Sequence, residues 1–294
     1  MRDIHQITEV NIMYYGIIMV AVLLFSLQFL FNQRFQREYG SGPKALLTFF
    51  LGYNVAGLLV LLIINRFRVE FSWFTLLLSF LWSVNCLVLS YCSFKAFEKV
   101  NLSVYSLFSQ LGGMMLPFFA GVLLFDEKLT AGSIICFVLV LISLLFTVKK
   151  GSGGSYIIYY AGIFVLNGMA GVLSKWFAAA PWEKTSSAGY SILSAAVAAL
   201  LAAVILPFIK GDRLKLSVKG ATNMLGYGVL NKIGNYLLLI ALVHLPASVQ
   251  YPMVTGGVMI CSTMICFFTR QKPGKREIAS LILSFAGIMA LVLL

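Results

Sequence analysis

Residues 96–115 read AFEKVNLSVYSLFSQLGGMM, and residues 241–260 read ALVHLPASVQYPMVTGGVMI. The two stretches align at a constant offset of 145 residues. The pairs that match along this alignment are Ala96 with Ala241, Ser103 with Ser248, Val104 with Val249, Gly112 with Gly257 and Met114 with Met259. Asn85 also corresponds to Asn231, at an offset of 146. We therefore expect the chain to contain one structural unit twice.

The composition around these stretches indicates a protein embedded in a membrane. Hydrophobic residues make up 60% of the 294 residues and charged residues only 11%, a balance foreign to soluble domains. About 20 apolar residues cross the hydrocarbon core as a helix, and helices satisfy their own backbone groups in lipid. The sequence predicts ten spans: residues 12–32, 45–64, 73–95, 103–125, 131–148, 156–177, 187–209, 222–243, 247–268 and 276–294. The first is expected to be a retained helix and not a cleaved signal peptide.

The predicted spans fall into two sets of five. Residues 149–155 (KKGSGGS) are rich in glycine and serine and predict a flexible linker. We predict an all-α integral membrane fold with ten transmembrane helices as two inverted five-helix repeats, residues 1–148 and 156–294, acting as one transport unit. A duplicated unit with an odd number of spans reverses its orientation, and such inverted repeats are typical of secondary transporters that bind substrate near the midplane.

The net charge of +12 has two interpretations, nucleic-acid binding and retention of basic loops in the cytoplasm. Loops after odd-numbered predicted spans carry fourteen lysines and arginines, whereas the N-terminus and the loops after even-numbered spans carry five. This asymmetry favours the second interpretation, because basic loops stay on the cytoplasmic side. We expect a multi-pass protein of the plasma (inner) membrane, with both termini outside and no nucleic-acid partner.

The chain lacks the residue patterns of an enzyme. Its ten carboxylates all fall at the termini, in loops or at the ends of spans. No phosphate loop, nucleophile elbow or metal-ligand cluster is present in the sequence. We therefore expect no catalytic residue, no metal and no cofactor. The same absence of a carboxylate in mid-membrane argues against a proton-coupled cation exporter.

The charge that does lie in mid-membrane is Lys232, near the centre of the predicted span 222–243. An ammonium at that depth needs a wet cavity, a polar partner or an anionic ligand. Asn231, Asn235 and Tyr227 lie close to it on the same helix and predict a broad polar face. Two interpretations stay open: a substrate-binding lysine, or a structural lysine that donates hydrogen bonds to backbone carbonyls.

Other polar residues within the predicted spans are candidates for the same cavity, although each alone is more often an interhelical hydrogen bond. They are Gln28, Asn85, Tyr91, Gln110, Asn167 and Lys175, together with Asn54, Gln250 and Tyr251. Lys175, near the end of the predicted span 156–177, has an equal alternative, which is to reach the interface with its long side chain.

Small residues recur at corresponding places in the two halves. Gly112 and Gly113 with Pro117 interrupt the predicted span 103–125, and Gly256 with Gly257 interrupts span 247–268. Glycine and proline permit local bending of a helix, so these five residues are hinge candidates. The alternative is close helix packing without a functional role, which is also our interpretation of the small residues in span 187–209.

The order of these features resembles the drug/metabolite transporter superfamily, specifically the ten-helix EamA-type exporters. The segments that resemble it are SFKAFEKVNLSVYSLFSQLGGMMLPFFAGVLLFDEKLT (residues 93–130), NGMAGVLSK (residues 167–175) and IALVHLPASVQYPMVTGG (residues 240–257). The resemblance implies a central cavity lined by spans 1, 3, 4, 6, 8 and 9, and export or exchange of small metabolites by alternating access. The second half departs from it by lacking a counterpart to Glu127.

The function we expect is secondary-active or exchange transport of a small, amino acid-like metabolite that bears a carboxylate or phosphate. Lys232 would attract the anionic group, and Asn231, Asn235 and Asn85 would orient the rest. The alternatives are an exporter of cationic or drug-like compounds, which the central lysine disfavours, and a membrane interaction or lipid-handling subunit that transports nothing. The expected partners are a small-molecule substrate and the lipid bilayer, and the protein is expected to be a monomer or homodimer.

Overall fold

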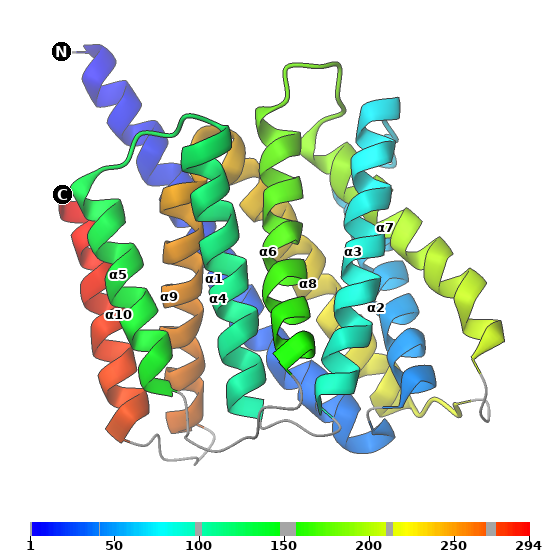
Figure 1. Cartoon of the computed structure of the whole chain (residues 1–294). Coiled ribbons are helices and arrows are strands. Elements are labelled where there is room, and N and C mark those ends of the chain that lie inside the picture. Colours follow the sequence, from blue (N-terminus) through cyan, green and yellow to red (C-terminus); the bar gives the residue numbers. More distant parts are fainter. Residues whose placement is uncertain (1, 41, 98–101, 148–156, 210–213, 269–274) are drawn as a thin grey trace.

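The computed structural model describes residues 2–40, 42–97, 102–147, 157–209, 214–268 and 275–294. Within these ranges the chain forms ten α-helices and no strand (Figure 1). The helices are α1 (Arg2–Tyr39), α2 (Pro43–Ile64), α3 (Trp73–Phe97), α4 (Leu102–Leu124), α5 (Ala131–Thr147), α6 (Ile157–Ala179), α7 (Ser187–Ile205), α8 (Val218–His244), α9 (Ala247–Phe268) and α10 (Lys275–Leu293). The predicted linker at residues 149–155 lies outside the described residues.

Each of the ten segments predicted from apolar runs contains a helix, and the largest differences in bounds occur in α1 and α8. The first apolar run was expected to end at residue 32, but α1 continues to Tyr39. Its last turns are polar, and Gln36 donates to Asn32 one turn earlier at 3.1 Å. Helix α8 begins at residue 218, before the apolar run, because Ser217 caps its first turn by accepting from the Gly220 N–H at 3.0 Å.

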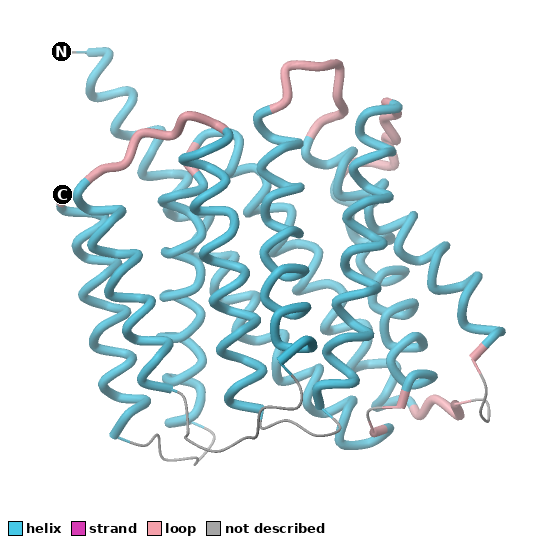
Figure 2. The backbone as a smooth tube through the Cα atoms, in the orientation of Figure 1, coloured by secondary structure: helices cyan, strands magenta, loops and turns pink. Residues whose placement is uncertain are grey.

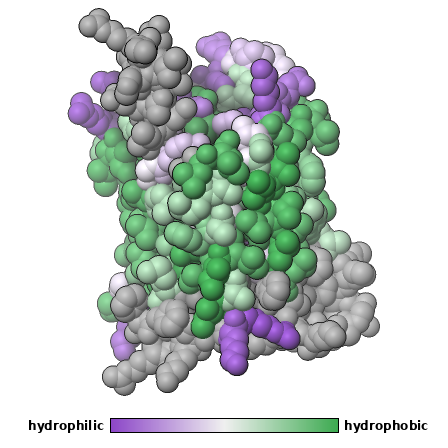
Figure 3. All heavy atoms as spheres, turned by 90° about the vertical axis from the view of Figure 1, so that its left-hand side faces the viewer, coloured by the Kyte–Doolittle hydropathy of each residue, from purple (hydrophilic) through white to green (hydrophobic). Residues whose placement is uncertain are grey.

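Six helices of the described chain are long and apolar enough to cross a membrane: Met13–Tyr39, Pro43–Ile64, Trp73–Cys92, Ala161–Ala179, Ser187–Phe208 and Val218–His244. Shorter apolar helical segments lie at Ser109–Leu124, Ala131–Ser143 and Leu281–Leu291. Figure 3 shows a continuous hydrophobic surface on the face of α5 and α10, with hydrophilic atoms above and below it. Large apolar side chains exposed over such an area mark a contact surface with another apolar phase.

The helices pack in a pattern that repeats when helix numbers are shifted by five. Helix α1 packs against α8 and α9, and α6 packs against α3 and α4. Helix α2 packs against α8 and α7 packs against α3, while α5 pairs with α10 and α4 with α9. Figure 2 shows that the chain enters and leaves the helical bundle at the same end, where the loops before α3, α5 and α7 also lie.

The apolar core joins the two halves of the chain. Its largest cluster contains Ile18 and Val22 of α1, Met114 of α4 and Met259 of α9, all buried. Helices α4 and α6 cross at very short range, because a Cβ atom added to Gly112 would overlap the carbonyl group of Phe164. Small residues let helix backbones approach in this way, so α4 is fixed against the first helix of the second half.

Candidate functional site

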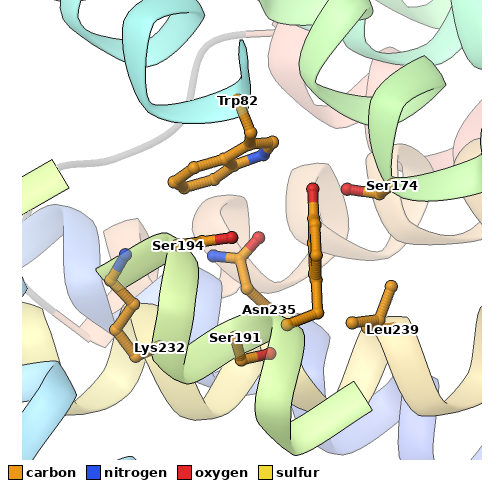
Figure 4. A pocket seen from close by; sticks show the side chains of 8 residues that line it. Trp82, Ser174, Ser191, Ser194, Lys232, Asn235 and Leu239 are labelled. Carbon is orange, nitrogen blue, oxygen red and sulfur yellow. The ribbon is translucent and has the colours of Figure 1, made fainter. Parts of the chain in front are cut away.

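A small cavity lies where α3, α6, α7 and α8 meet (Figure 4). Its volume is about 40 Å³, room for no more than a few water molecules, since one water needs about 10–15 Å³ on this measure. It is lined by Trp82 of α3, Ser174 of α6, Tyr190, Ser191 and Ser194 of α7, and Lys232, Asn235 and Leu239 of α8. The lining therefore combines one helix of the first half with three helices of the second.

Lys232 is the charged residue of this cavity, and its side chain is 4% exposed. Its Nζ atom lies 5.0 Å from the ring centre of Trp82 and 5.8 Å from that of Tyr53. These are cation–π distances, which attract the ammonium without supplying a hydrogen-bond acceptor. Its aliphatic stem packs over Gly57 of α2, where any Cβ atom would overlap the Lys232 side chain. A small residue on α2 therefore makes room for the lysine.

No carboxylate or carbonyl among the described residues accepts a hydrogen bond from the Lys232 ammonium. Lys184, in the loop after α6, shows what a structural lysine looks like in this protein. Its Nζ donates to the carbonyls of Phe177, Ala178 and Ala180 at 3.0, 2.7 and 2.9 Å. Lys232 therefore lacks, within the described chain, the carbonyl hydrogen bonds that a structural lysine would form.

The predicted polar face of α8 is present beside Lys232. Asn231 donates to the side-chain oxygen of Gln28 on α1 at 3.0 Å, so two predicted candidates meet. Asn235 lines the cavity and donates to the Asn231 carbonyl at 2.8 Å. Tyr227 packs against the rings of Tyr53 and Phe49, at 4.9 and 5.0 Å between ring centres, so it contributes to an aromatic cluster next to the lysine.

Three residues of α7, Tyr190, Ser191 and Ser194, form the wall opposite α8. Ser194 donates to Ser79 of α3 at 3.1 Å, and Ser83 donates to the Ser194 carbonyl at 3.1 Å. The buried hydroxyl of Tyr190 lies near the hydroxyls of Ser174 and Ser194 in the same cavity. Figure 4 shows Lys232 at one side of the cavity, with Trp82 above it and Ser174 and Leu239 at the other side. A ligand group in this cavity would meet the hydroxyls of Tyr190, Ser174 and Ser194.

Lys175 lies outside this cavity and has a different partner. Its Nζ atom is 2.5 Å from Oε1 of Glu127, and both side chains are buried, at 11% and 7% exposed. Oε1 also accepts from the Ala247 N–H at 2.8 Å, and Oε2 accepts from the Ser248 N–H at 3.0 Å. The alternative in which Lys175 reaches the interface is therefore wrong, because the carboxylate of the α4–α5 loop holds it inside.

The electrostatics of Glu127 follow from these contacts. Burial alone would raise the pKa of the carboxyl group. The hydrogen bonds from Lys175 and from the Ser248 and Ala247 amides, with the charge of Lys175, outweigh burial and hold the pKa below its ordinary value. The group is thus ionised near neutral pH, and it stabilises the first turn of α9, where negative charge is favoured by the helix dipole.

Four other candidates form interhelical hydrogen bonds or lie apart from the cavity. Asn85 donates to the Leu166 carbonyl at 2.8 Å, which joins α3 to α6. Asn167 donates to the Ser109 carbonyl at 2.5 Å, which joins α6 to α4. Gln110 is half-buried on α4 and is not among the cavity residues. Tyr91 is 56% exposed on the outside of α3, so its predicted place in a central cavity is wrong.

The hinge candidates lie at helix crossings. Added Cβ atoms at Gly112 and Gly113 would overlap Phe164 and the Asn167 amide of α6, and one at Gly257 would press on Val22 of α1. A Cβ atom added to Gly256 would lie 3.1 Å from Val140, which is also a tight contact, and Pro117 is buried within an uninterrupted α4. Close packing accounts for four of the five residues, and bending at any of them stays a prediction.

Several cavity residues were missing from the prediction. Ser191 is predicted only as part of a packing face, and Trp82, Ser174, Tyr190 and Ser194 are not among the predicted site residues. Ser191 and Ser194 are separated by one helical turn, which puts them on one face of α7. The implied lining also differs, because α7 contributes to this cavity whereas α1, α4 and α9 do not. Within the described residues, no group of histidine, cysteine, aspartate and glutamate side chains is arranged to hold a metal ion.

No model of a known protein family matches this chain, and no curated protein sequence matches it. A solved structure described as "Crystal structure of protein" is similar over 94% of this chain and 95% of its own, with a TM-score of 0.77. Sequence identity between the two is 15%. At that identity the likeness shows a shared fold and does not bear on function.

Proposed function

We propose that this protein is a multi-pass membrane transporter of the EamA type in the drug/metabolite transporter superfamily, which moves a small metabolite bearing a carboxylate or phosphate. The observation that carries the proposal is Lys232, a buried ammonium without a carboxylate partner in the described chain, facing a cavity lined with hydroxyl and amide groups. A buried cation of this kind is most favourable when an anionic ligand completes it.

The proposed architecture is ten spans in two inverted halves. Its support is the packing pattern, in which the neighbours of α6 are the neighbours of α1 with helix numbers reduced by five. The two predicted ends of the bundle differ in basic charge, with fourteen lysines and arginines in the loops after odd-numbered spans and five in the N-terminus and the remaining loops, and such a difference orients membrane proteins. The end with the loops before α2, α4, α6, α8 and α10 is therefore proposed to face the cytoplasm, and the end with both termini the outside of the plasma (inner) membrane.

In the proposed binding mode, the ammonium of Lys232 binds the anionic group of the cargo, and neighbouring polar side chains form hydrogen bonds with the rest. The anionic group of the cargo takes the place beside Lys232, and Trp82 and Tyr53 shield it from lipid and water. Asn235, Ser191 and Ser194 then contact the rest of the cargo. Because cavities that hold small ligands measure about 300–1,000 Å³, a cavity of about 40 Å³ has to expand on binding.

Expansion requires one of two closures to open, as alternating access demands. On the proposed outer side, Glu127 joins the α4–α5 loop to Lys175 and to the start of α9. On the proposed inner side, Phe49, Tyr53 and Tyr227 pack ring against ring between α2 and α8. We propose that the ionic contact and the aromatic cluster open in turn while α8 carries the binding lysine.

The test is thermal unfolding of purified protein with a panel of amino acids, organic acids, phosphosugars, nucleotides and cationic drugs. A ligand that binds only the folded state raises the melting temperature by mass action. We expect a shift with anionic or zwitterionic compounds, followed by exchange of the same compound in liposomes. A shift with cations alone would favour drug export and overturn the lysine site. No shift and no exchange across the panel would favour a subunit without a transport cycle.

A further inference from the structure

A second and larger opening lies between the C-terminal end of α1 and the N-terminal end of α8, at the end of the molecule opposite both termini. Its volume is about 420 Å³. The residues that line it are Arg34, Arg37, Glu38, Val218, Lys219, Thr222 and Asn223. We call it the basic groove. Its volume exceeds that of the Lys232 cavity tenfold, so it accepts a substantial chemical group without rearrangement.

The basic groove has an excess of positive charge. Arg34, Arg37 and Lys219 are exposed, and none of them forms an ion pair with a carboxylate of the described chain. The acidic residue in the groove, Glu38, accepts a hydrogen bond from the Ser217 hydroxyl at 2.5 Å. The groove therefore presents three cations against one carboxylate that is already engaged. Guanidinium groups bind phosphate with two parallel hydrogen bonds.

A buried amide faces the same groove. Asn223 is 8% exposed and lines the opening, yet its side chain forms no hydrogen bond with any described residue. Its amide atoms are open to the groove, since they do not belong to the fully buried side-chain atoms that lack a partner. An amide NH₂ group donates two hydrogen bonds, which suits a phosphate oxygen placed between it and the arginines. This amide and the cations are independent observations that indicate the same ligand.

The surface above the groove is apolar on both of its walls. On α1, the exposed residues Val20 and Leu27 precede Arg34 at intervals of seven residues, so the three lie on one helix face. On α8, Val218 and Leu225 are exposed at the same interval. Since α1 and α8 pack side by side, an apolar surface leads down to the charged groove. A soluble metabolite would not contact that apolar surface, whereas the acyl chain of a lipid would pack against it.

We propose that the basic groove binds the phosphate of an anionic phospholipid in the leaflet on the cytoplasmic side, with its acyl chains along the apolar faces of α1 and α8. The inference rests on the membrane insertion stated under the proposed function and not on transport or on cargo. Basic pockets between helices at this depth recognise lipid head groups by charge and by shape. Bound lipid would hold α1 against α8, directly below the contact between Gln28 and Asn231.

The experiment measures thermal unfolding in a neutral detergent with added dioleoyl phosphatidylglycerol, dioleoyl phosphatidylcholine, or soluble glycerol phosphate. The variants are Arg34→Gln/Arg37→Gln and, separately, Asn223→Asp, which places a carboxylate in the groove. The control is Arg66→Gln/Arg68→Gln, which removes the same charge from exposed arginines of the α2–α3 loop at the opposite end. If the double variant cannot be purified as a single species, the melting temperature of Asn223→Asp alone decides the test.

We expect phosphatidylglycerol to raise the melting temperature of the wild type and of the control, and added salt to reduce the shift. The shift should be lost in both groove variants, and phosphatidylcholine should give none. An equal shift in the groove variants or with phosphatidylcholine would overturn the proposal, and an equal shift with glycerol phosphate would assign the groove to free anions. Wild-type protein that does not float with liposomes would instead overturn membrane insertion itself. Lys232→Met should keep the lipid shift, which separates this site from the cargo site.

Discussion

Glu127 and Lys175 form a buried ion pair whose N–O distance is 2.5 Å, although 48 residues separate them in the chain. The same carboxylate accepts hydrogen bonds from two amides at the start of α9. One loop residue of the first half is therefore bound to two separate helices of the second half. The second half has no counterpart to Glu127 in its sequence, so a repeat of the two halves would not reproduce this contact.

Glu127→Gln should destabilise the protein strongly, because it leaves the Lys175 ammonium buried without its counter-charge. Loss of one partner of a buried ion pair costs about 3 kcal/mol or more. The measurement is the melting temperature, with the exposed loop acid Glu183→Gln as the control. The charge-reversed double variant Glu127→Lys/Lys175→Glu should not recover stability, because a lysine at 127 cannot accept from the Ala247 and Ser248 amides. Full recovery would mean that the two charges alone carry the contact.

The pH dependence of stability should have a sign that follows from Glu127. Its pKa in the folded state lies below the ordinary value, which is about 4.3 in the unfolded chain. The stabilisation is therefore fully present above the unfolded pKa and is lost as the pH falls through the folded pKa. The difference in melting temperature between the wild type and Glu127→Gln should be constant from neutral to weakly acidic pH and shrink at strongly acidic pH. A difference that grows on acidification would contradict this assignment.

Lys232→Met should abolish exchange of an anionic cargo in liposomes while leaving the melting temperature unchanged or higher. The variant keeps an unbranched side chain of similar length but removes the cost of burying a charge. Lys215→Met, an exposed lysine ahead of α8, is the matched control and should retain transport. Undiminished exchange by the Lys232 variant would exclude the lysine from the binding site.

Gly112→Ala should lower the melting temperature because its methyl group would overlap the backbone carbonyl of Phe164 and push α4 away from α6. Inserting a methyl group into a tightly packed site costs about 1–3 kcal/mol. Gly16→Ala on α1 is the matched control, since nothing lies within 4 Å of the added atom, and it should leave stability unchanged or slightly raised. Equal behaviour of the two variants would show that α4 and α6 separate without cost.

The positions of the helices were predictable because each apolar run predicts a helix from its own residues, without knowledge of the helices that pack against it. Lys232 was predictable for the same reason, as a charge in the middle of such a run. The rotation of each helix about its axis was not, because a helix in lipid is apolar on its outer face as well as its inner one. In α3, Tyr91 faces outward and Trp82 faces the cavity. The apolar pattern of the helix does not distinguish the two positions, so their orientation could not be predicted.

The partners of polar residues were equally beyond the sequence. Asn85 and Asn167 were candidate ligand contacts, yet both donate to backbone carbonyls of neighbouring helices. Every residue has a backbone carbonyl that can accept a hydrogen bond, so the side-chain pattern does not predict which carbonyl is the acceptor. The cluster of Asn231, Asn235 and Lys232 could be anticipated because all three lie on one helix, where spacing alone decides which residues share a face.

The contact between Glu127 and the start of α9 uses main-chain amides, so it does not depend on which side chains stand at residues 247 and 248. Only positions 127 and 175 are bound to each other by side-chain chemistry. Among diverged relatives, those two positions should vary together, while positions 247 and 248 should be restricted by their burial and not by this contact. The contact between the two halves would thus be kept as the sequence changes, and covariation would be expected at one pair of positions, 127 and 175.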